Sequence, residues 1–123
     1  MACTKDLVDV RIDRPAIGLV VVRVTGEVDI LGAPTVRQCI DTSLPSARAF
    51  VLDLSDTTFF GAAGLSVLVH VSALAERLSV RWALVGSTAV LRPLRVTNLE
   101  RELPVCRDFS AAVLAAATSP AMS

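Results

Sequence analysis

Two short apolar segments joined by an apolar helix-like segment constrain the fold of this chain more than any other feature. Residues 50–54 read Phe-Val-Leu-Asp-Leu and residues 81–85 read Arg-Trp-Ala-Leu-Val. Near-continuous apolar runs of this length are typical of strands buried on both faces of a sheet. A strand–helix–strand crossover pairs its two strands in parallel through a right-handed connection. The sequence therefore predicts an α/β fold.

The remaining segments add one hairpin and further helices to this crossover. Alternation and β-branched residues predict strands at 7–12 and 17–25, joined by a turn at 13–16 that contains Pro15. A helix opens at Gly32-Ala33-Pro34, because proline suits a first helical turn. Further along we expect a helix from the N-cap Ser87 to residue 96, with a kink at Pro93 and a left-handed Asn98 after its end. A strand at 103–106 and a helix at 111–117, capped by Ser110, should follow.

This pattern gives one domain, residues 1–123, with a core of about 8–117 and short flexible termini. Its expected architecture is a mixed sheet of four to five strands with about four helices packed against it. The helix after Gly61 carries apolar residues around more than half of its circumference, which is wider than one sheet contact needs. Either the first helix covers the surplus through Val36 and Ile40, or a partner does.

Charge and hydropathy exclude several classes of protein. Twelve basic and twelve acidic residues give a formal net charge of zero, and the basic residues are scattered, so we expect no nucleic-acid partner. The longest apolar run has six residues, 17–22, far fewer than the ~20 of a membrane-spanning helix. The N-terminus lacks the basic-then-apolar pattern of a signal peptide. We expect a cytoplasmic protein without membrane contact.

The residues that carry chemistry form no catalytic or metal-binding pattern. His70 is the only histidine and has no ligand at metal spacing, so a solvent-facing residue is the expectation. Asp53 and Asp56 flank Ser55 without a paired nucleophile, and Asp53 is expected to end its strand by accepting loop amides. We therefore expect no enzyme, no metal and no cofactor. Cys39 and Cys106 are expected to be small buried residues, and the alternative is a redox switch that links them.

The loop before the central helix resembles a known family. The segment Asp53-Leu-Ser, followed by Phe59-Phe60-x-x-x-Gly64-Leu65, resembles the STAS domains of bacterial anti-sigma factor antagonists. Similar matches are Thr25-Gly26-Glu27-Val28-Asp29 upstream, and the tail from Leu84-Val85-Gly86 through Val90, Leu94 and Leu99. The resemblance covers roughly residues 8–117 and implies the STAS fold.

The resemblance also implies a function, in which an antagonist binds an ATP-binding anti-sigma factor of the serine-kinase type and releases a sigma factor. In that family a serine at the helix start accepts a phosphate, which ends binding. Here Gly61 stands in place of the family's aspartate, Ala62 in place of the phosphoacceptor serine and Ala63 in place of the following serine or threonine, whereas Gly64 and Leu65 match. Ala62 cannot accept a phosphoryl group, so that route is closed. Thr57, Thr58 and Ser66 are nearby hydroxyls that either replace it or are simply solvated.

The implied partner face consists of the corner after Asp29 and the loop and first turn that follow residue 57. Phe59 is expected in the core, and Phe60 as an exposed apolar contact. The predicted partner-binding residues are Asp29, Thr57, Thr58, Phe60, Gly61, Ala62, Ala63, Gly64, Leu65 and Ser66. The alternatives to antagonism are a scaffold or assembly subunit that forms a homodimer, and a small-ligand (nucleotide) sensor that uses the Gly61–Gly64 turn.

Overall fold

The structure is a computed structural model that describes residues 2–5 and 7–117, with the side chains of 2–5 outside that description. One sheet has the strand order β1-β2-β3-β4-β5-β6. Its strands are β1 (Ala2–Lys5), β2 (Val8–Ala16), β3 (Leu19–Val28), β4 (Ala49–Phe60), β5 (Arg81–Gly86) and β6 (Val105–Cys106). The helices are α1 (Ala33–Ser43), α2 (Ala62–Leu78), α3 (Thr88–Val96) and α4 (Phe109–Ala117), with short 3-10 turns at Leu44–Ser46 and Leu99–Arg101. The expected α/β class is confirmed.

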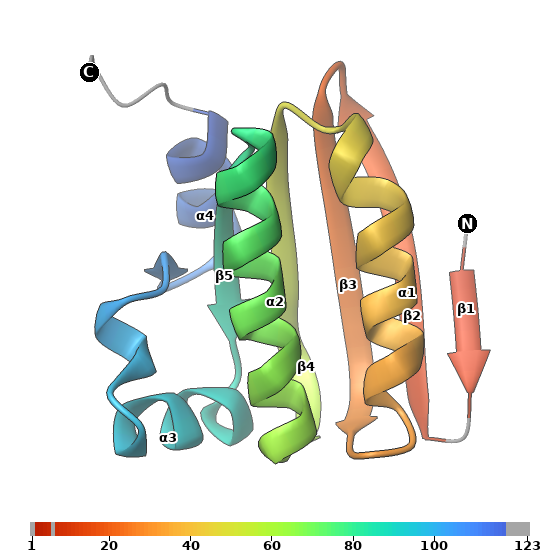
Figure 1. The fold of residues 1–123 in the computed structure, drawn as a ribbon, viewed down its shortest axis with the longest axis vertical. Coiled ribbons are helices and arrows are strands. Elements are labelled where there is room, and N and C mark those ends of the chain that lie inside the picture. The colour runs from red at the N-terminus through yellow and green to blue at the C-terminus, as the bar shows by residue number, and fades with distance from the viewer. Residues whose placement is uncertain (1, 6, 118–123) are drawn as a thin grey trace.

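Strand direction divides the sheet into two parts. β1, β2 and β3 pair antiparallel, whereas β3, β4, β5 and β6 run parallel. Helices α1 and α2 carry the chain between the parallel strands on one side of the sheet, as Figure 1 shows. The predicted crossover is therefore confirmed. All three long parallel strands end at the same edge, where α1, α2 and α3 begin (Figure 1).

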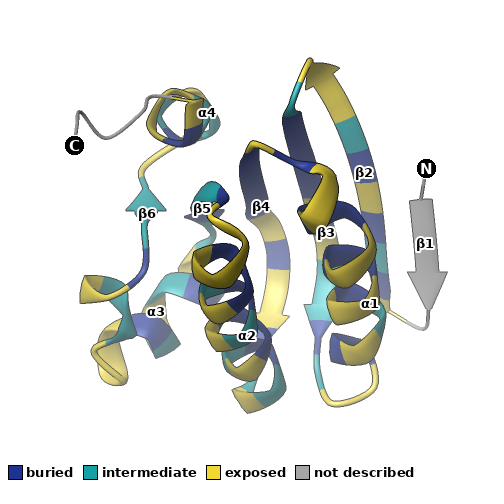
Figure 2. Ribbon diagram, turned by 45° about the horizontal axis from the view of Figure 1, so that its top comes forward, coloured by how far each residue is buried: buried dark blue, intermediate teal, exposed yellow. Residues whose placement is uncertain are grey.

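The sheet separates two hydrophobic cores. On β3, Val20, Val22 and Val24 belong to the larger core, which also contains the buried residues of α1, α2 and α3. The alternate residues Leu19 and Val21 belong to a smaller core under α4. This division follows from the period of two along a strand. Figure 2 shows the buried inner sides of α1 and α2 facing the sheet.

Several boundaries differ from the expectation. A sixth strand, β1, pairs with the edge of β2 where a flexible N-terminus was expected, while the expected flexible tail at 118–123 lies outside the described residues. β2 continues to Ala16 through a bulge that contains Pro15, so the hairpin turn falls at Ile17 and Gly18 rather than at 13–16. A bulge accommodates proline inside a strand because it breaks the hydrogen-bond ladder there. β4 continues to Phe60, six residues beyond the expected end at residue 54.

The helix signals were confirmed except at the last cap. Ser87 and Asn98 occupy the predicted N-cap and left-handed positions, and Pro93 lies inside α3. Helix α4 begins at Phe109, and the side chain that caps it is Asp108, whose Oδ1 accepts a hydrogen bond from the Ala111 amide at 2.8 Å. The prediction of Ser110 as this cap was wrong, because an aspartate two residues earlier offers a stronger acceptor.

Helix α2 packs against the sheet and beside α1. Val36 and Ile40 of α1 share the larger core with the inner face of α2, as expected. Helix α2 is not fully covered, because Val69 on its outer side and Leu78 in its last turn remain exposed. His70 is only partly exposed, and its Nε2 lies 2.5 Å from Asp41 Oδ1 on α1, so it links the two helices rather than facing solvent. Within the described residues, no helix is both long and apolar enough to cross a membrane.

Candidate functional site

Three segments meet at the edge of the sheet where β3 and β4 end. They are the β3–α1 connection at residues 29–32, the end of β4 at 58–60 and the start of α2 at 61–66. Val28 pairs with Phe60, and the Gly61 amide donates a hydrogen bond to the Val28 carbonyl at 3.1 Å. The ends of β3 and β4 are thus joined directly. The resulting edge has the location where open α/β sheets place binding sites, outside the carboxyl ends of their strands.

Asp29 shapes the first of these segments. Its Oδ1 accepts hydrogen bonds from the Leu31 amide at 3.0 Å and from the Gly32 amide at 2.8 Å. This Asx turn reverses the chain and starts α1, since the Asp29 carbonyl also accepts the Ala33 amide. The carboxylate that the sequence assigns to partner binding is therefore already engaged inside the protein. The turn leaves Ile30 80% exposed and Leu31 62% exposed.

The last residues of β4 contain two bulges. Arg23 and Thr25 of β3 face Asp53 and Asp56, and Gly26 and Glu27 face Thr57 and Phe59, so β4 contributes one extra residue at each step. A bulge reverses the alternation of side chains that follow it. Thr57 is therefore turned inward, only 2% exposed, and its hydroxyl donates to the Val24 carbonyl at 3.0 Å. Thr58, the extra residue of the second bulge, is exposed.

The two phenylalanines are placed opposite to expectation. Phe60 is 7% exposed and belongs to the larger core, whereas Phe59 is 50% exposed. Both predictions were wrong because residues 55–58 were read as a loop. Two bulges cancel, so the inward phase of Leu54 returns at Phe60. Phe60 packs on Gly64, where an added Cβ would lie only 2.7 Å from a ring carbon.

The start of α2 is open and uncharged. Gly61 is the N-cap without a side-chain hydrogen bond, and Ala62 and Ser66 are exposed one turn apart. Ala63 and Leu65 are partly buried against the core. Residues 57–69 contain no charged side chain. The described geometry provides neither a nucleophile–base pair nor a charged group at this helix start.

We call Ile30, Leu31, Phe59, Ala62 and Ser66 the end face. All five are exposed, and they come from the three segments that meet at this edge. Single exposed apolar residues are common, but a group on one edge beside a helix start is typical of a protein-binding surface. The corner after Asp29 was expected in the partner face, but Ile30 and Leu31 were not named as contact residues. Two large apolar residues directly after Asp29 were the available signal, and residues of a core-facing strand would give the same signal.

The cysteines lie on opposite sides of the sheet. Cys39 is buried in the larger core, whereas Cys106 packs against the smaller one, and the two are not bonded. The alternative of a redox link between them is therefore contradicted, because the sheet separates them. Burial, aided by the negative charge of Asp108, raises the pKa of the Cys106 thiol above its ordinary value of 9.0. A raised pKa makes the thiolate scarcer at neutral pH.

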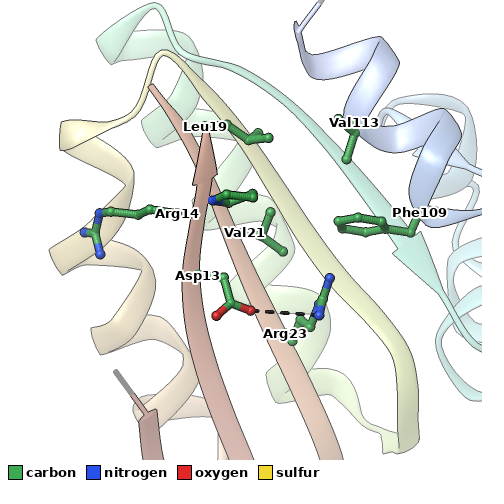
Figure 3. Close-up of a pocket in the computed structure, with 8 residues that line it drawn as sticks. Asp13, Arg14, Leu19, Val21, Arg23, Phe109 and Val113 are labelled. Carbon is green, nitrogen blue, oxygen red and sulfur yellow. Dashed lines mark ion pairs between the residues drawn. The ribbon is translucent and has the colours of Figure 1, made fainter. Parts of the chain in front are cut away.

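A cleft lies on the α4 side of the sheet, far from the end face. It has a volume of about 460 Å³ between α4 and the strands β2 and β3, with Val21 and Phe109 among its apolar walls (Figure 3). Arg23 lies 3.8 Å from Asp13 and 3.5 Å from Asp53, and its guanidinium carbon is 4.8 Å from the Phe109 ring centroid. Two carboxylates thus lie beside the Arg23 guanidinium, and Arg14 is the second arginine of the lining.

Known proteins share this architecture. An anti-sigma factor antagonist from Mycobacterium paratuberculosis superposes with a TM-score of 0.81 and 27% identity, covering 90% of this chain and 95% of that one. The Bacillus cell fate determinant SpoIIAA in its phosphorylated form gives a TM-score of 0.63 with 16% identity, over 80% of this chain and 92% of that one, and supports the fold alone.

A curated relative and a family model complete the comparison. Osmosensory protein A of Mycobacterium tuberculosis is 32% identical over 74 residues, which is 60% of this chain and 47% of the relative. The chain thus matches about half of that protein's length. The STAS domain model matches residues 9–112 and so includes both the β3–α1 turn and the start of α2. This chain belongs to the STAS domain family.

Proposed function

We propose that this protein is a non-enzymatic anti-sigma factor antagonist that binds an ATP-binding, kinase-type anti-sigma factor through the end face. The observation that carries the proposal is the exposed, uncharged group at the ends of β3 and β4, on a fold that an anti-sigma factor antagonist shares over 95% of its length. Apolar residues gathered beside a helix start fit a protein partner better than a small polar substrate.

The same geometry supports a docking surface that is not switched at the usual position. Ala62 is the exposed first residue of α2, and its methyl group has no atom that can bond to phosphorus. The position that the sequence resemblance equates with the family's phosphoacceptor is therefore permanently uncharged. Control of the complex then falls to protein abundance or to another group on the same edge.

A binding assay tests the proposal with a matched control. Kinase-type anti-sigma factors are titrated against the wild-type chain and against Leu31→Glu, which places a charge on the end face. We expect Leu31→Glu to weaken the complex at least tenfold, since desolvating one uncompensated charge costs more than about 1.4 kcal/mol. Ile17→Glu is the control, because Ile17 is fully exposed in the β2–β3 turn at the opposite edge.

A second arm tests the docking pose. Ala62→Ser restores a hydroxyl at the start of α2, so a kinase-type partner that docks there should transfer phosphate from ATP to that serine. Equal weakening by both glutamate variants, or failure of every tested anti-sigma factor to bind the wild-type chain, would overturn the proposal.

Self-association is a second candidate, favoured by one observation. Val69 on the outer side of α2 is 52% exposed, and Leu78 in the last turn of the same helix is 41% exposed. A homodimer that covers exposed apolar residues of α2 predicts a concentration-dependent mass in light scattering. Replacing both residues by serine should restore the monomer mass, and a constant monomer mass for the wild-type chain rejects this candidate.

A further inference from the structure

A cleft at the edge of the end face is lined by two threonines and one arginine. The cleft has a volume of about 400 Å³ and lies between the end of β4 and the first turns of α3. It is lined by Thr58, Phe59, Phe60, Thr88, Ala89, Arg92 and Pro93. Thr58 reaches it because the second bulge of β4 turns this side chain outward. We call this group the Thr58 cleft.

Three other hydroxyls near this edge either donate a hydrogen bond within the protein or have no positively charged residue beside them on their helix. The Thr57 hydroxyl is buried and donates to the Val24 carbonyl. The Ser55 hydroxyl donates to Asp53 Oδ1 at 2.6 Å. Ser66 is exposed on α2, where the surrounding residues of its helix are uncharged. Thr58 and Thr88 both combine an exposed side chain with Arg92 in the same cleft, and of the two Thr58 directly precedes Phe59 of the end face.

The groups opposite Thr58 are suited to a dianion. Arg92 is exposed and forms no ion pair with the described side chains of residues 7–117. Thr88 and Ala89 are the first residues of α3, whose opening amides have no acceptor inside the helix. Ser87 does not cap them, because its hydroxyl instead donates to the Thr57 carbonyl. A guanidinium and the start of a nine-residue helix thus face the same space.

We propose that Thr58 is a phosphorylation site and that Arg92, with the opening amides of α3, holds the phosphoryl group. In the reaction, Thr58 Oγ1 attacks the γ-phosphorus of ATP bound to a serine/threonine kinase. The bond from that phosphorus to the β,γ-bridging oxygen breaks, ADP leaves, and the hydroxyl proton passes to the kinase's base. The product carries nearly two negative charges, which favour a guanidinium and a helix start.

The regulatory consequence rests on the proposed function. Phe59 of the end face also lines the Thr58 cleft. A phosphate there places charge at the border of a surface that is otherwise uncharged, so docking weakens. The Thr58 cleft would then supply the control that Ala62 cannot.

The holding contacts are tested without any partner. The full chain is prepared with phosphothreonine incorporated at position 58, and its folding equilibrium constant is compared with that of the unmodified chain in urea at low salt. We expect phosphorylation to raise the folding equilibrium constant about three- to tenfold. In the Arg92→Gln background the phosphorylated and unmodified chains should have nearly equal constants, a ratio of about one. T58E against T58Q gives a smaller gain of the same sign, and S66E against S66Q is the control without a facing cation. No gain in the wild-type background, or an equal gain in Arg92→Gln, overturns the assignment.

The modification itself is tested with ATP and a panel of bacterial serine/threonine kinases, followed by site mapping by mass spectrometry. Phosphate should enter Thr58 faster than Ser66 or Thr57, and Thr58→Val should abolish that signal. Preferential labelling of another residue, or no labelling, overturns the proposal.

The partner assay separates this inference from the proposed function. T58E should weaken an anti-sigma factor complex more than tenfold relative to T58Q. A complex that T58E leaves unchanged overturns the regulatory role while antagonism stands. If the wild-type chain binds no anti-sigma factor, antagonism fails and the stability and labelling results for Thr58 still decide the site.

Discussion

The packing of Gly64 against the Phe60 ring makes Gly64→Ala an informative perturbation of the candidate site. A Cβ at position 64 would meet three ring carbons at 2.7, 2.8 and 2.9 Å, whereas carbon atoms pack best at about 3.5–4.0 Å. The ring is 7% exposed and cannot turn freely into solvent. Overpacking of this kind costs about 1–3 kcal/mol, while alanine in a helix gains about 1 kcal/mol over glycine. We expect a net loss of about 1 kcal/mol in the free energy of unfolding.

The sign of this effect should depend on Phe60. In a Phe60→Leu background the three ring contacts are absent, so Gly64→Ala should stabilise by about 1 kcal/mol. The coupling between the two positions is then about 2 kcal/mol. Equilibrium urea unfolding measures it, with the single tryptophan, Trp82, as the probe. Ala73→Gly is the control, because residue 73 is exposed on the same helix and should cost about 1 kcal/mol in both backgrounds.

Two results would refute the reasoning. If Gly64→Ala stabilises the wild-type chain, the ring does not hold the start of α2. If the substitution has the same effect in both backgrounds, its cost arises elsewhere than at Phe60.

Three further predictions concern the turns and the thiol. Gly26→Ala should lower the free energy of unfolding by about 2–5 kcal/mol, because φ is +100° and a Cβ would lie 2.0 Å from the Leu7 carbonyl oxygen. An unchanged urea concentration at the unfolding midpoint would contradict this. Asp29→Ala should cost about 1 kcal/mol and speed hydrogen exchange at the Leu31 and Gly32 amides, whereas Asp29→Asn, which keeps an oxygen acceptor, should largely retain protection. Alkylation of Cys106 at pH 8.5 should be slower than that of an exposed cysteine, because its pKa is raised, and Asp108→Asn should speed it. The folded state binds the Cys106 proton more tightly than the unfolded state, so the thiol's contribution to stability is present below pH 9.0 and is lost as pH rises through the folded pKa. Equal alkylation rates for Cys106 and an exposed cysteine would refute the shift.

Local signals predicted the parallel half of the fold well. The apolar segments at 50–54 and 81–85, the proline of α1 and the left-handed Asn98 each act within a few residues, so pattern alone identifies them. The family resemblance located the start of α2. β1 was not predicted, because its pairing with β2 depends on a distant edge rather than on its own four residues.

The candidate site was less predictable because two bulges control it. Polar residues 55–58 read as a loop, yet they form part of β4. Which of two adjacent phenylalanines faces inward depends on the number of extra residues before them, and single-sequence patterns do not count bulges. Likewise, the separation of Cys39 from Cys106 follows from the sheet lying between them, which their spacing along the chain does not reveal.

The paired bulges of β4 have a consequence for length variation. Short polar stretches between a strand and a helix usually accept the loss of one residue, since a loop only has to span a gap. Here each bulge holds one residue of β4 that has no partner on β3. Removal of Thr58 would therefore leave Thr57 and Phe59 facing Gly26 and Glu27 in a regular ladder, with Phe60 still turned inward. Tolerance of deletions in this stretch should extend to the two extra residues, one from each bulge, and end there.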